Sequence, residues 1–259
     1  MHKKTLHITL IQSNLHWENI NQNLVDFTEK LNLLGETDLV VLPEMFSTGF
    51  SMLPQLFAEE AGEKTLAWMK MQAKKHHCAI TGSTMQAESG KYLNRLYFVY
   101  PSGEFVYYDK RHLFSLGDEH NYYSRGNKRV FATLHGWRFA LQICYDLRFP
   151  VFSRNDSNYD VLLYVANWPE RRQKAWETLL PARAIENQCY VVACNRIGAD
   201  GNGIEHSGAS VVVDYHGTVL MNANSDSGIF TCTLDYDALS QFKEKFPFLA
   251  DKDPFMILD

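Results

Sequence analysis

The sequence predicts an α/β fold in which two mixed β-sheets stack on each other and helices cover their outer faces. Three observations lead to this prediction. Short apolar runs typical of buried strands alternate with stretches of helical periodicity. Three turn signals join strand-like segments into hairpins. With about ten strands and only about four helices, one sheet covered on both faces would be overfull, so two sheets fit better.

The first half of the chain is predicted to alternate strands and helices. Leucine and isoleucine alternate with polar residues over 6–11, which indicates a strand. A helix is predicted over 19–34, because its apolar residues recur every three or four positions and Gly35 follows as a C-cap. The next elements are a buried strand at 38–43, a helix at 65–77 and a buried strand at 78–82.

Hairpins dominate the second half. Each turn contains glycine, and the paired strands are 95–100 with 104–108, 130–134 with 138–144, and 211–214 with 218–221. The remaining elements are strand 160–166, helix 171–187, strand 189–195 and strand 229–234. Residues 236–259 carry aromatic side chains without a clear period, so this tail is expected either to pack back on its own domain or to lie at a subunit interface.

Length and composition indicate one ordinary globular domain. Of the 259 residues, 46% are hydrophobic and 21% are charged, which argues against disorder and against a coiled coil. Because no repeat, low-complexity tract or flexible linker interrupts the chain, we expect residues 1–259 to form a single domain.

Charge and cysteine usage exclude several classes of function. The net charge of −5, without a basic stripe, argues against a nucleic-acid partner. No segment approaches the roughly 20 apolar residues of a membrane span, and we expect no signal peptide. The five cysteines are odd in number and include no C-x-x-C pair, which argues against disulfides and a zinc site and for a reducing, cytoplasmic compartment.

Three reactive residues come at the ends of predicted strands. Glu44 follows strand 38–43, Lys110 follows the second strand of the first hairpin, and Cys144 ends the second hairpin. Sites of α/β proteins gather beyond the carboxyl ends of strands, so a thiol nucleophile, a carboxylate and an ammonium group form a plausible set there. Taken one at a time, each also has a structural interpretation, as a loop charge, a charged turn or a buried thiol.

The segments around these residues resemble the three signatures of the nitrilase, or carbon–nitrogen hydrolase, superfamily. They are Leu42-Pro43-Glu44-Met45-Phe46, Tyr108-Asp109-Lys110-Arg111-His112-Leu113-Phe114 and Gln142-Ile143-Cys144-Tyr145-Asp146-Leu147-Arg148-Phe149-Pro150. They stand in the family's order, and segments 167–169, 183–187 and 206–210 add further agreement. The resemblance covers about residues 6–234, and the chain is most similar to the ω-amidase branch.

The resemblance implies an α-β-β-α sandwich that forms a homodimer and uses no metal and no organic cofactor. It also implies a catalytic triad of Glu44, Lys110 and Cys144. Glu119 is the best match to a second glutamate of the family's active site, although Asp118 stands beside it. Glu119 would orient Lys110 or the substrate amide; the alternative is a surface carboxylate in a charged loop.

The expected reaction is amide hydrolysis through a cysteine thioester. The Lys110 cation should favour the thiolate of Cys144, and Glu44 should accept and return protons. Lys110 and the backbone N–H of Tyr145 would stabilise the oxyanion. The family mechanism needs no histidine, so His112 and His120 are interpreted as structural.

The resemblance suggests ω-amides of 2-oxo acids, such as 2-oxoglutaramate, as substrates. Their distal carboxylate calls for arginine, and Arg171 and Arg172 are the candidates. Phe46, Tyr123 and Trp168 would form an apolar wall, unless they belong to the core.

Other functions stay open. The same triad would serve a nitrilase or an N-carbamoyl amidohydrolase, and a catalytically silent family member would act as a binding protein. A papain-like protease is rejected, because its histidine base would have to be His206 or His216, and His206 lies in a loop of the nitrilase pattern.

Overall fold

The computed structural model describes residues 3–257, without the side chains of residues 59–61. Residues 1–2 and 258–259 lie outside the described residues. They are the two ends of the predicted domain, and 258–259 also end the predicted tail. Every helix in the described part of the chain is too short or too polar to span a lipid bilayer.

Two six-stranded sheets form the centre of the molecule. The first sheet has the order β12-β1-β2-β3-β4-β5, and the second has the order β11-β10-β9-β8-β7-β6. The strands are β1 (Thr5–Gln12), β2 (Leu39–Val41), β3 (Ala79–Glu88), β4 (Lys91–Val99), β5 (Phe105–Asp109), β6 (Phe131–Leu134), β7 (Trp137–Ile143), β8 (Val161–Ala166), β9 (Tyr190–Asn195), β10 (Val211–Val213), β11 (Val219–Asn222) and β12 (Gly228–Asp235).

Both sheets are mixed in the same way. Strands β1, β2 and β3 run parallel in the first sheet, and β7, β8 and β9 run parallel in the second. The outer strands pair antiparallel, through hairpins such as β4–β5 and β6–β7. The predicted α/β fold of two stacked mixed sheets is therefore confirmed.

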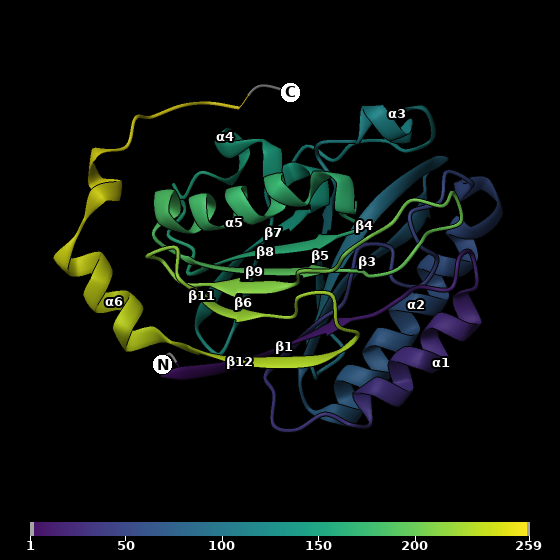
Figure 1. Ribbon diagram of the computed structural model, residues 1–259, viewed down its shortest axis with the longest axis horizontal. Coiled ribbons are helices and arrows are strands. Elements are labelled where there is room, and N and C mark those ends of the chain that lie inside the picture. Colours follow the sequence, from purple (N-terminus) through teal and green to yellow (C-terminus); the bar gives the residue numbers. More distant parts are fainter. Residues whose placement is uncertain (1–2, 258–259) are drawn as a thin grey trace.

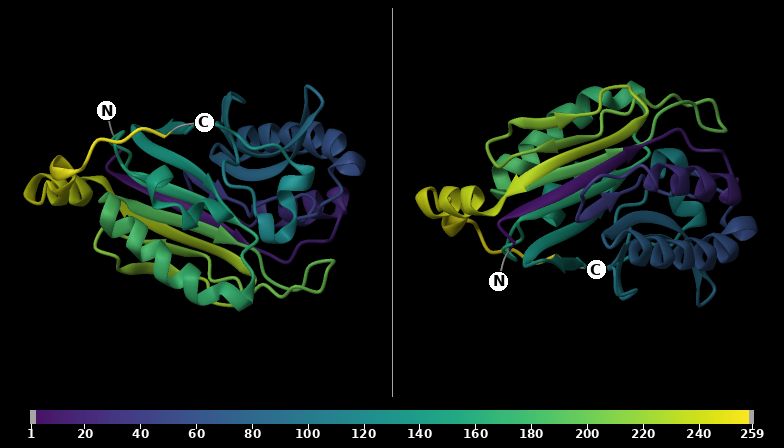
Figure 2. Two further views of the ribbon diagram at one scale, coloured as in Figure 1. Left: turned by 90° about the horizontal axis from the view of Figure 1, so that it is seen from above. Right: turned by 90° about the horizontal axis from the view of Figure 1, so that it is seen from below.

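Helices cover the outer faces of the two sheets (Figures 1 and 2). The first sheet is covered by α1 and α2, and the second by α5, whereas α6 projects from one end of the sandwich. The α-helices are α1 (Ile20–Leu31), α2 (Pro54–His76), α3 (Glu119–Tyr122), α4 (Pro150–Ser153), α5 (Gln173–Asn187) and α6 (Tyr236–Lys245). The 3₁₀ turns are η1 (Ser115–Gly117), η2 (Cys144–Arg148), η3 (Glu170–Arg172) and η4 (Phe248–Asp251).

Alternation along the strands divides the core into two layers. In β2, Leu39 and Val41 point between the sheets, while Val40 points outward against α1 and α2. This strand is fully buried on both faces, as its continuous apolar run predicts.

Several predicted boundaries are wrong. Helix α2 begins at Pro54, well before the predicted residue 65. The first turns were missed because Leu56 is 66% exposed, so the apolar residues there do not follow a helical period. Helix α1 ends at Leu31, and its C-cap is Asn32, not Gly35. The β3–β4 hairpin and helix α6 were missed, although Ser89 and Gly90 are a turn signal.

Candidate active site

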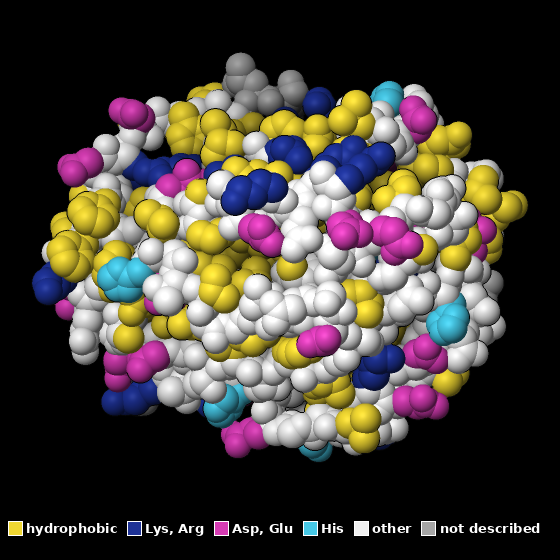
Figure 3. Space-filling model, viewed as in Figure 1, with side chains coloured by type: hydrophobic (Ala, Val, Ile, Leu, Met, Phe, Trp, Pro, Cys, Tyr) yellow, Lys and Arg dark blue, Asp and Glu magenta, His cyan; other side chains and the backbone are white. Residues whose placement is uncertain are grey.

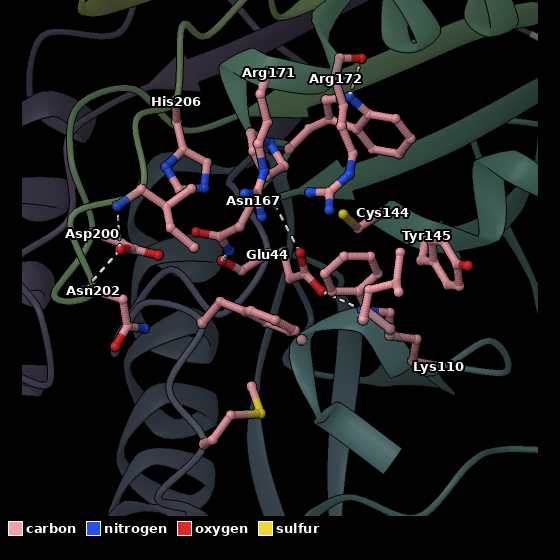
Figure 4. A pocket seen from close by; sticks show the side chains of 18 of the residues that line it. Glu44, Lys110, Cys144, Tyr145, Asn167, Arg171, Arg172, Asp200, Asn202 and His206 are labelled. Carbon is pink, nitrogen blue, oxygen red and sulfur yellow. Dashed lines mark hydrogen bonds and ion pairs between the residues drawn. The ribbon is translucent and has the colours of Figure 1, made fainter.

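Glu44, Lys110 and Cys144 meet at one edge of the sandwich, where the parallel strands end (Figure 4). Glu44 comes after β2, Lys110 comes directly after β5, and Cys144 opens η2 after β7. All three line a pocket of about 130 Å³. This is smaller than the roughly 300–1,000 Å³ of pockets for drug-sized ligands, so the site suits a small molecule.

Glu44 is fully buried, and both of its carboxylate oxygens accept hydrogen bonds. Oε1 accepts from Lys110 Nζ at 2.8 Å and from Asn94 Nδ2 at 2.8 Å, and Oε2 accepts from the backbone N–H of Asn167 at 2.8 Å. Asn167 also donates from its side chain to the carbonyl of Glu44. These bonds tie the segment after β2 to the segment after β8 and thus join the two sheets at the site.

Lys110 lies between two carboxylates. Its Nζ is 2.8 Å from Glu44 Oε1 and 2.9 Å from Glu119 Oε2, and its side chain is 1% exposed. Burial alone would lower the pKa of Lys110, but the negative charges of Glu119 and Glu44 outweigh burial and raise it. Lys110 is therefore a cation in this site.

Glu119 begins α3 and is fully buried, so the interpretation as a surface carboxylate is wrong. Besides Lys110, its carboxylate accepts from the backbone N–H of Phe114 at 2.6 Å. Burial raises the pKa of Glu119, Lys110 opposes this shift, and the charge of Glu44 adds to it.

Cys144 has a left-handed backbone, with φ of 45°, at the sharp turn from β7 into η2. Burial and then the charge of Glu44 raise the pKa of the Cys144 thiol well above its usual value, while Lys110 only partly offsets them. Lys110 thus favours the thiolate, as expected, but burial and Glu44 together favour the neutral thiol more strongly. The resting group is a neutral thiol that hydrogen-bonds to Glu44.

Asp146, two residues after Cys144, holds the turn in place, and the sequence analysis missed it. Its fully buried carboxylate accepts from the backbone N–H of Ile143 at 2.9 Å and from the Tyr108 hydroxyl at 2.7 Å. It also lies 2.7 Å from Nδ1 of His112, whose ring stacks on Phe149. His112 therefore packs beside the site and holds Asp146, which agrees with its interpretation as a structural residue.

Four of the six predicted substrate contacts line the pocket: Tyr145, Trp168, Arg171 and Arg172. The other two do not. Phe46 packs in the core against Phe27 and Trp68, and the hydroxyl of the buried Tyr123 donates to the carbonyl of Ser51 at 2.8 Å. Trp168 does line the pocket, and the rest of the apolar wall is formed by Phe50, Met52, Phe114 and Leu116, none of which was predicted.

Arginines are the principal positive groups at the mouth of the pocket. Arg148, which the sequence analysis missed, lies over the ring of Trp168 at 5.2 Å, and Arg172 lies over the ring of Phe114 at 4.9 Å. Nη1 of Arg172 is buried and has no hydrogen-bond partner among the described residues. Burial and the neighbouring charges of Arg171 and Arg148 lower the pKa of Arg172. An anion placed there would relieve this repulsion.

Among residues 3–257, no group of three or more histidine, cysteine, aspartate or glutamate side chains is arranged to hold a metal ion. In the pocket, both oxygens of Glu44 are occupied by N–H donors. The arrangement offers a thiol, a buried carboxylate that can take its proton and a fixed cation beside them. These are the parts of a nucleophilic acyl transfer.

Comparison with known proteins agrees with this chemistry. The family model described as "Carbon-nitrogen hydrolase" matches residues 8–244. The chain is 44% identical to the ω-amidase YafV of Escherichia coli (strain K12) over 97% of its own length and 98% of that protein. It is 37% identical to the 2-oxoglutaramate amidase of Bacillus subtilis (strain 168), over 83% of its own length and 84% of that protein.

A solved structure shares the fold over the whole length. A CN-hydrolase superfamily protein from Xanthomonas campestris, which has an arsenic adduct in its active site, superimposes with a TM-score of 0.92 at 41% identity. The match covers 99% of this chain and 100% of that one.

Proposed function

The chain belongs to the carbon–nitrogen hydrolase family, and we propose that it hydrolyses the terminal amide of ω-amides of 2-oxo acids, such as 2-oxoglutaramate, to a carboxylate and ammonia. Its likeness to ω-amidases over nearly the full length makes it an enzyme of amide hydrolysis. The substrate and the roles of individual residues are our proposal.

The observation that supports this proposal most is the contact of Lys110 with two buried carboxylates beside Cys144. Burying three ionisable groups together is costly unless they are paired, and structural cores rarely contain such a set. At the bottom of a pocket, the same set supplies a nucleophile, a base and a cation.

In the first half of the proposed reaction, Sγ of Cys144 attacks the amide carbon while Glu44 takes the thiol proton. The carbonyl electrons move onto oxygen, where Lys110 and the backbone N–H of Tyr145 stabilise them; Tyr145 lies in the first turn of η2, where N–H groups lack helical partners. Glu44 then gives its proton to nitrogen, the C–N bond breaks, and ammonia leaves.

In the second half, water attacks the thioester while Glu44 removes a proton from it. The C–S bond breaks, the proton held by Glu44 returns to the thiolate, and the carboxylic acid product gives its proton to water and leaves as the carboxylate. Because the same carboxylate serves both halves, its position between Lys110 and Cys144 matters throughout. Glu119 takes no proton in this scheme and orients Lys110.

We assign the distal carboxylate of the substrate to Arg172. Its buried, unpartnered Nη1 supplies a charge-assisted donor on the Cys144 side of the pocket (Figure 4). Trp168 holds the backbone of Arg172, because its indole N–H donates to that carbonyl at 2.9 Å.

We also propose that residues 1–259 act as one domain in a cytoplasmic homodimer. Hydrophobic side chains gather over α6 and the segment after it on the face in Figure 3, and Phe248 there is 61% exposed. Ile185 on α5 is 54% exposed as well. The five free cysteines fit a reducing compartment.

Ammonia release from a small panel tests the proposed function. The panel contains 2-oxoglutaramate, 2-oxosuccinamate, glutamine, an aliphatic nitrile and an N-carbamoyl amino acid. We expect release from the two oxo-acid amides, and its loss in Cys144→Ala. Release from the nitrile or the carbamoyl compound alone would contradict the proposed substrate.

A further inference from the structure

Asn94 contacts three of the residues proposed to act in catalysis, although the reaction scheme assigns it no part. It lies in the middle of β4 and is fully buried. Its Nδ2 donates to Glu44 Oε1 at 2.8 Å and to Glu119 Oε1 at 3.2 Å. Its backbone carbonyl accepts from the N–H of Lys110 at 3.0 Å. One residue thus touches both carboxylates and the backbone of the lysine between them.

The amide of Asn94 is oriented by a second chain of hydrogen bonds. Its Oδ1 accepts from the hydroxyl of Ser83 at 2.9 Å, and Ser83 Oγ in turn accepts from the backbone N–H of Met45 at 2.9 Å. With Oδ1 engaged by Ser83, the two N–H groups of the amide face the two carboxylates. This series of hydrogen bonds begins at the backbone N–H of Met45 and returns to the carboxylate of Glu44, the residue directly before Met45.

The hydrogen bonds from Asn94 to the two carboxylates also affect the electrostatics of the site. Glu44 and Glu119 are fully buried and share one ammonium group, and two such carboxylates repel each other. The other titratable groups that interact with the pair are Cys144 and Tyr123, both of which are acids, so neither adds a positive charge. The amide of Asn94 adds a neutral donor to each carboxylate, and such donors favour the charged form.

We propose that Asn94 is a positioning residue that fixes Glu44 and Glu119 on Lys110 and stabilises negative charge on the carboxylate that accepts the thiol proton. The proposal rests on the proposed function, because it concerns the base of that reaction. Asn94 does not line the pocket, so it acts through Glu44 and not on the substrate.

Two variants test the role of the amide. Asn94→Ala removes the amide and both of its N–H donors. Asn94→Asp keeps the shape of the side chain but replaces the NH2 group with a carboxyl oxygen. The matched control is Asn155→Ala. Asn155 is also fully buried and also donates twice from Nδ2, at 3.0 Å and 2.9 Å, but to the backbone carbonyls of Tyr159 and Asn187, away from the site.

The first measurement is the pH profile of ammonia release. We expect both Asn94 variants to lower kcat about 100-fold, with KM within about threefold of the wild type, because a small displacement of a catalytic group costs about that much. The acid limb of kcat/KM should move up by about one pH unit, since each carboxylate loses a donor to its charged form. Asn155→Ala should reduce thermal stability without moving the acid limb.

The second measurement needs no substrate. Alkylation of Cys144 by iodoacetamide, followed peptide by peptide across pH, reports how readily the thiol loses its proton to Glu44; the half-buried Cys232 serves as the internal reference. We expect the acid limb for Cys144 to move up in both Asn94 variants, while the profile for Cys232 is unchanged.

The proposal would be overturned if the acid limb of Cys144 alkylation stayed at the wild-type pH in Asn94→Asp. It would also be overturned if Asn155→Ala moved that limb by the same amount. If the wild type released no ammonia from any amide, the proposed function would fail, while the alkylation profiles would still decide the role of Asn94.

Discussion

In the proposed function, Arg172 binds the distal carboxylate and thereby sets the choice of substrate. Its guanidinium packs on Phe114 and leaves Nη1 buried without a partner among the described residues, whereas the side chain of the adjacent Arg171 is exposed. A buried donor without a partner is costly, and a substrate carboxylate would provide the missing acceptor. The two neighbouring arginines should therefore differ sharply in their effect on binding.

We expect Arg172→Gln to raise KM for 2-oxoglutaramate about 10- to 100-fold, with a smaller change in kcat, because a hydrogen bond to a charged group is lost. Steady-state kinetics on that substrate, and on a neutral amide of similar size without the distal carboxylate, measure the effect. Arg171→Gln is the control and should change KM less than about threefold. Equal effects of the two variants, or an equal effect on the neutral amide, would contradict the assignment.

At the scale of the elements, the close approach of two strands places Glu44. The chain after β2 continues alongside β3, where the N–H of Leu42 donates to Thr81 and the N–H of Phe46 donates to Ser83. A Cβ at Gly82 would come within 2.8 Å of the Phe46 ring and 3.0 Å of the Leu42 Cβ. Glycine at this position of β3 leaves room for the segment that carries the carboxylate.

We expect Gly82→Ala to lower the free energy of unfolding by about 1–3 kcal/mol, because Phe46 must move in a packed core. It should also lower kcat, since Glu44 lies in the displaced segment. Equilibrium urea unfolding and ammonia release measure the two effects. Gly35→Ala is the control, because nothing lies within 4 Å of a Cβ there, and its change should stay within about 0.5 kcal/mol. A stable and fully active Gly82→Ala variant would show that this approach is not needed.

At the scale of the whole molecule, loops from both sheets meet beside the pocket. The segment after β9 bridges to Asn14, which follows β1, and Arg196 donates to the Asn14 side chain at 2.8 Å. His206, in the same loop, is 5% exposed. Burial and the charge of Arg196 lower the pKa of His206 to about 4. His206 therefore stays neutral in the folded protein at pH values where the unfolded chain binds a proton.

This difference makes the stability depend on pH. Between about pH 6.5 and pH 4 the unfolded chain binds more protons than the folded protein, so the free energy of unfolding falls as the pH falls, by up to about 3 kcal/mol. Urea unfolding at a series of pH values should show that His206→Gln removes this part of the decline. His120→Gln, at an exposed position, should leave the decline unchanged. Parallel curves for wild type and His206→Gln would refute the prediction.

Local patterns were sufficient for most elements. A parallel strand that is buried on both faces has a continuous apolar run, and glycine is favoured in tight hairpin turns, so these elements can be recognised without knowledge of their neighbours. The β3–β4 hairpin is the exception, because its Ser89–Gly90 turn was overlooked. Helix α6 was missed, although Asp235 is a visible N-cap whose side chain accepts from the N–H of Ala238 at 3.0 Å. Its exposed apolar residues blur the period that a packed helix would show.

The same limit applies to the site. Glu44, Lys110 and Cys144 stand in recognisable motifs, so the sequence alone predicts the triad; it also predicts the family and the class of reaction, both of which the comparisons confirm. Asn94 and Asp146 become significant only when strands distant in sequence are brought together, because a buried asparagine or aspartate has no local pattern that tells which group it binds. The neutral state of Cys144 was also decided by the tertiary structure, because burial and the nearby charge of Glu44 outweigh Lys110.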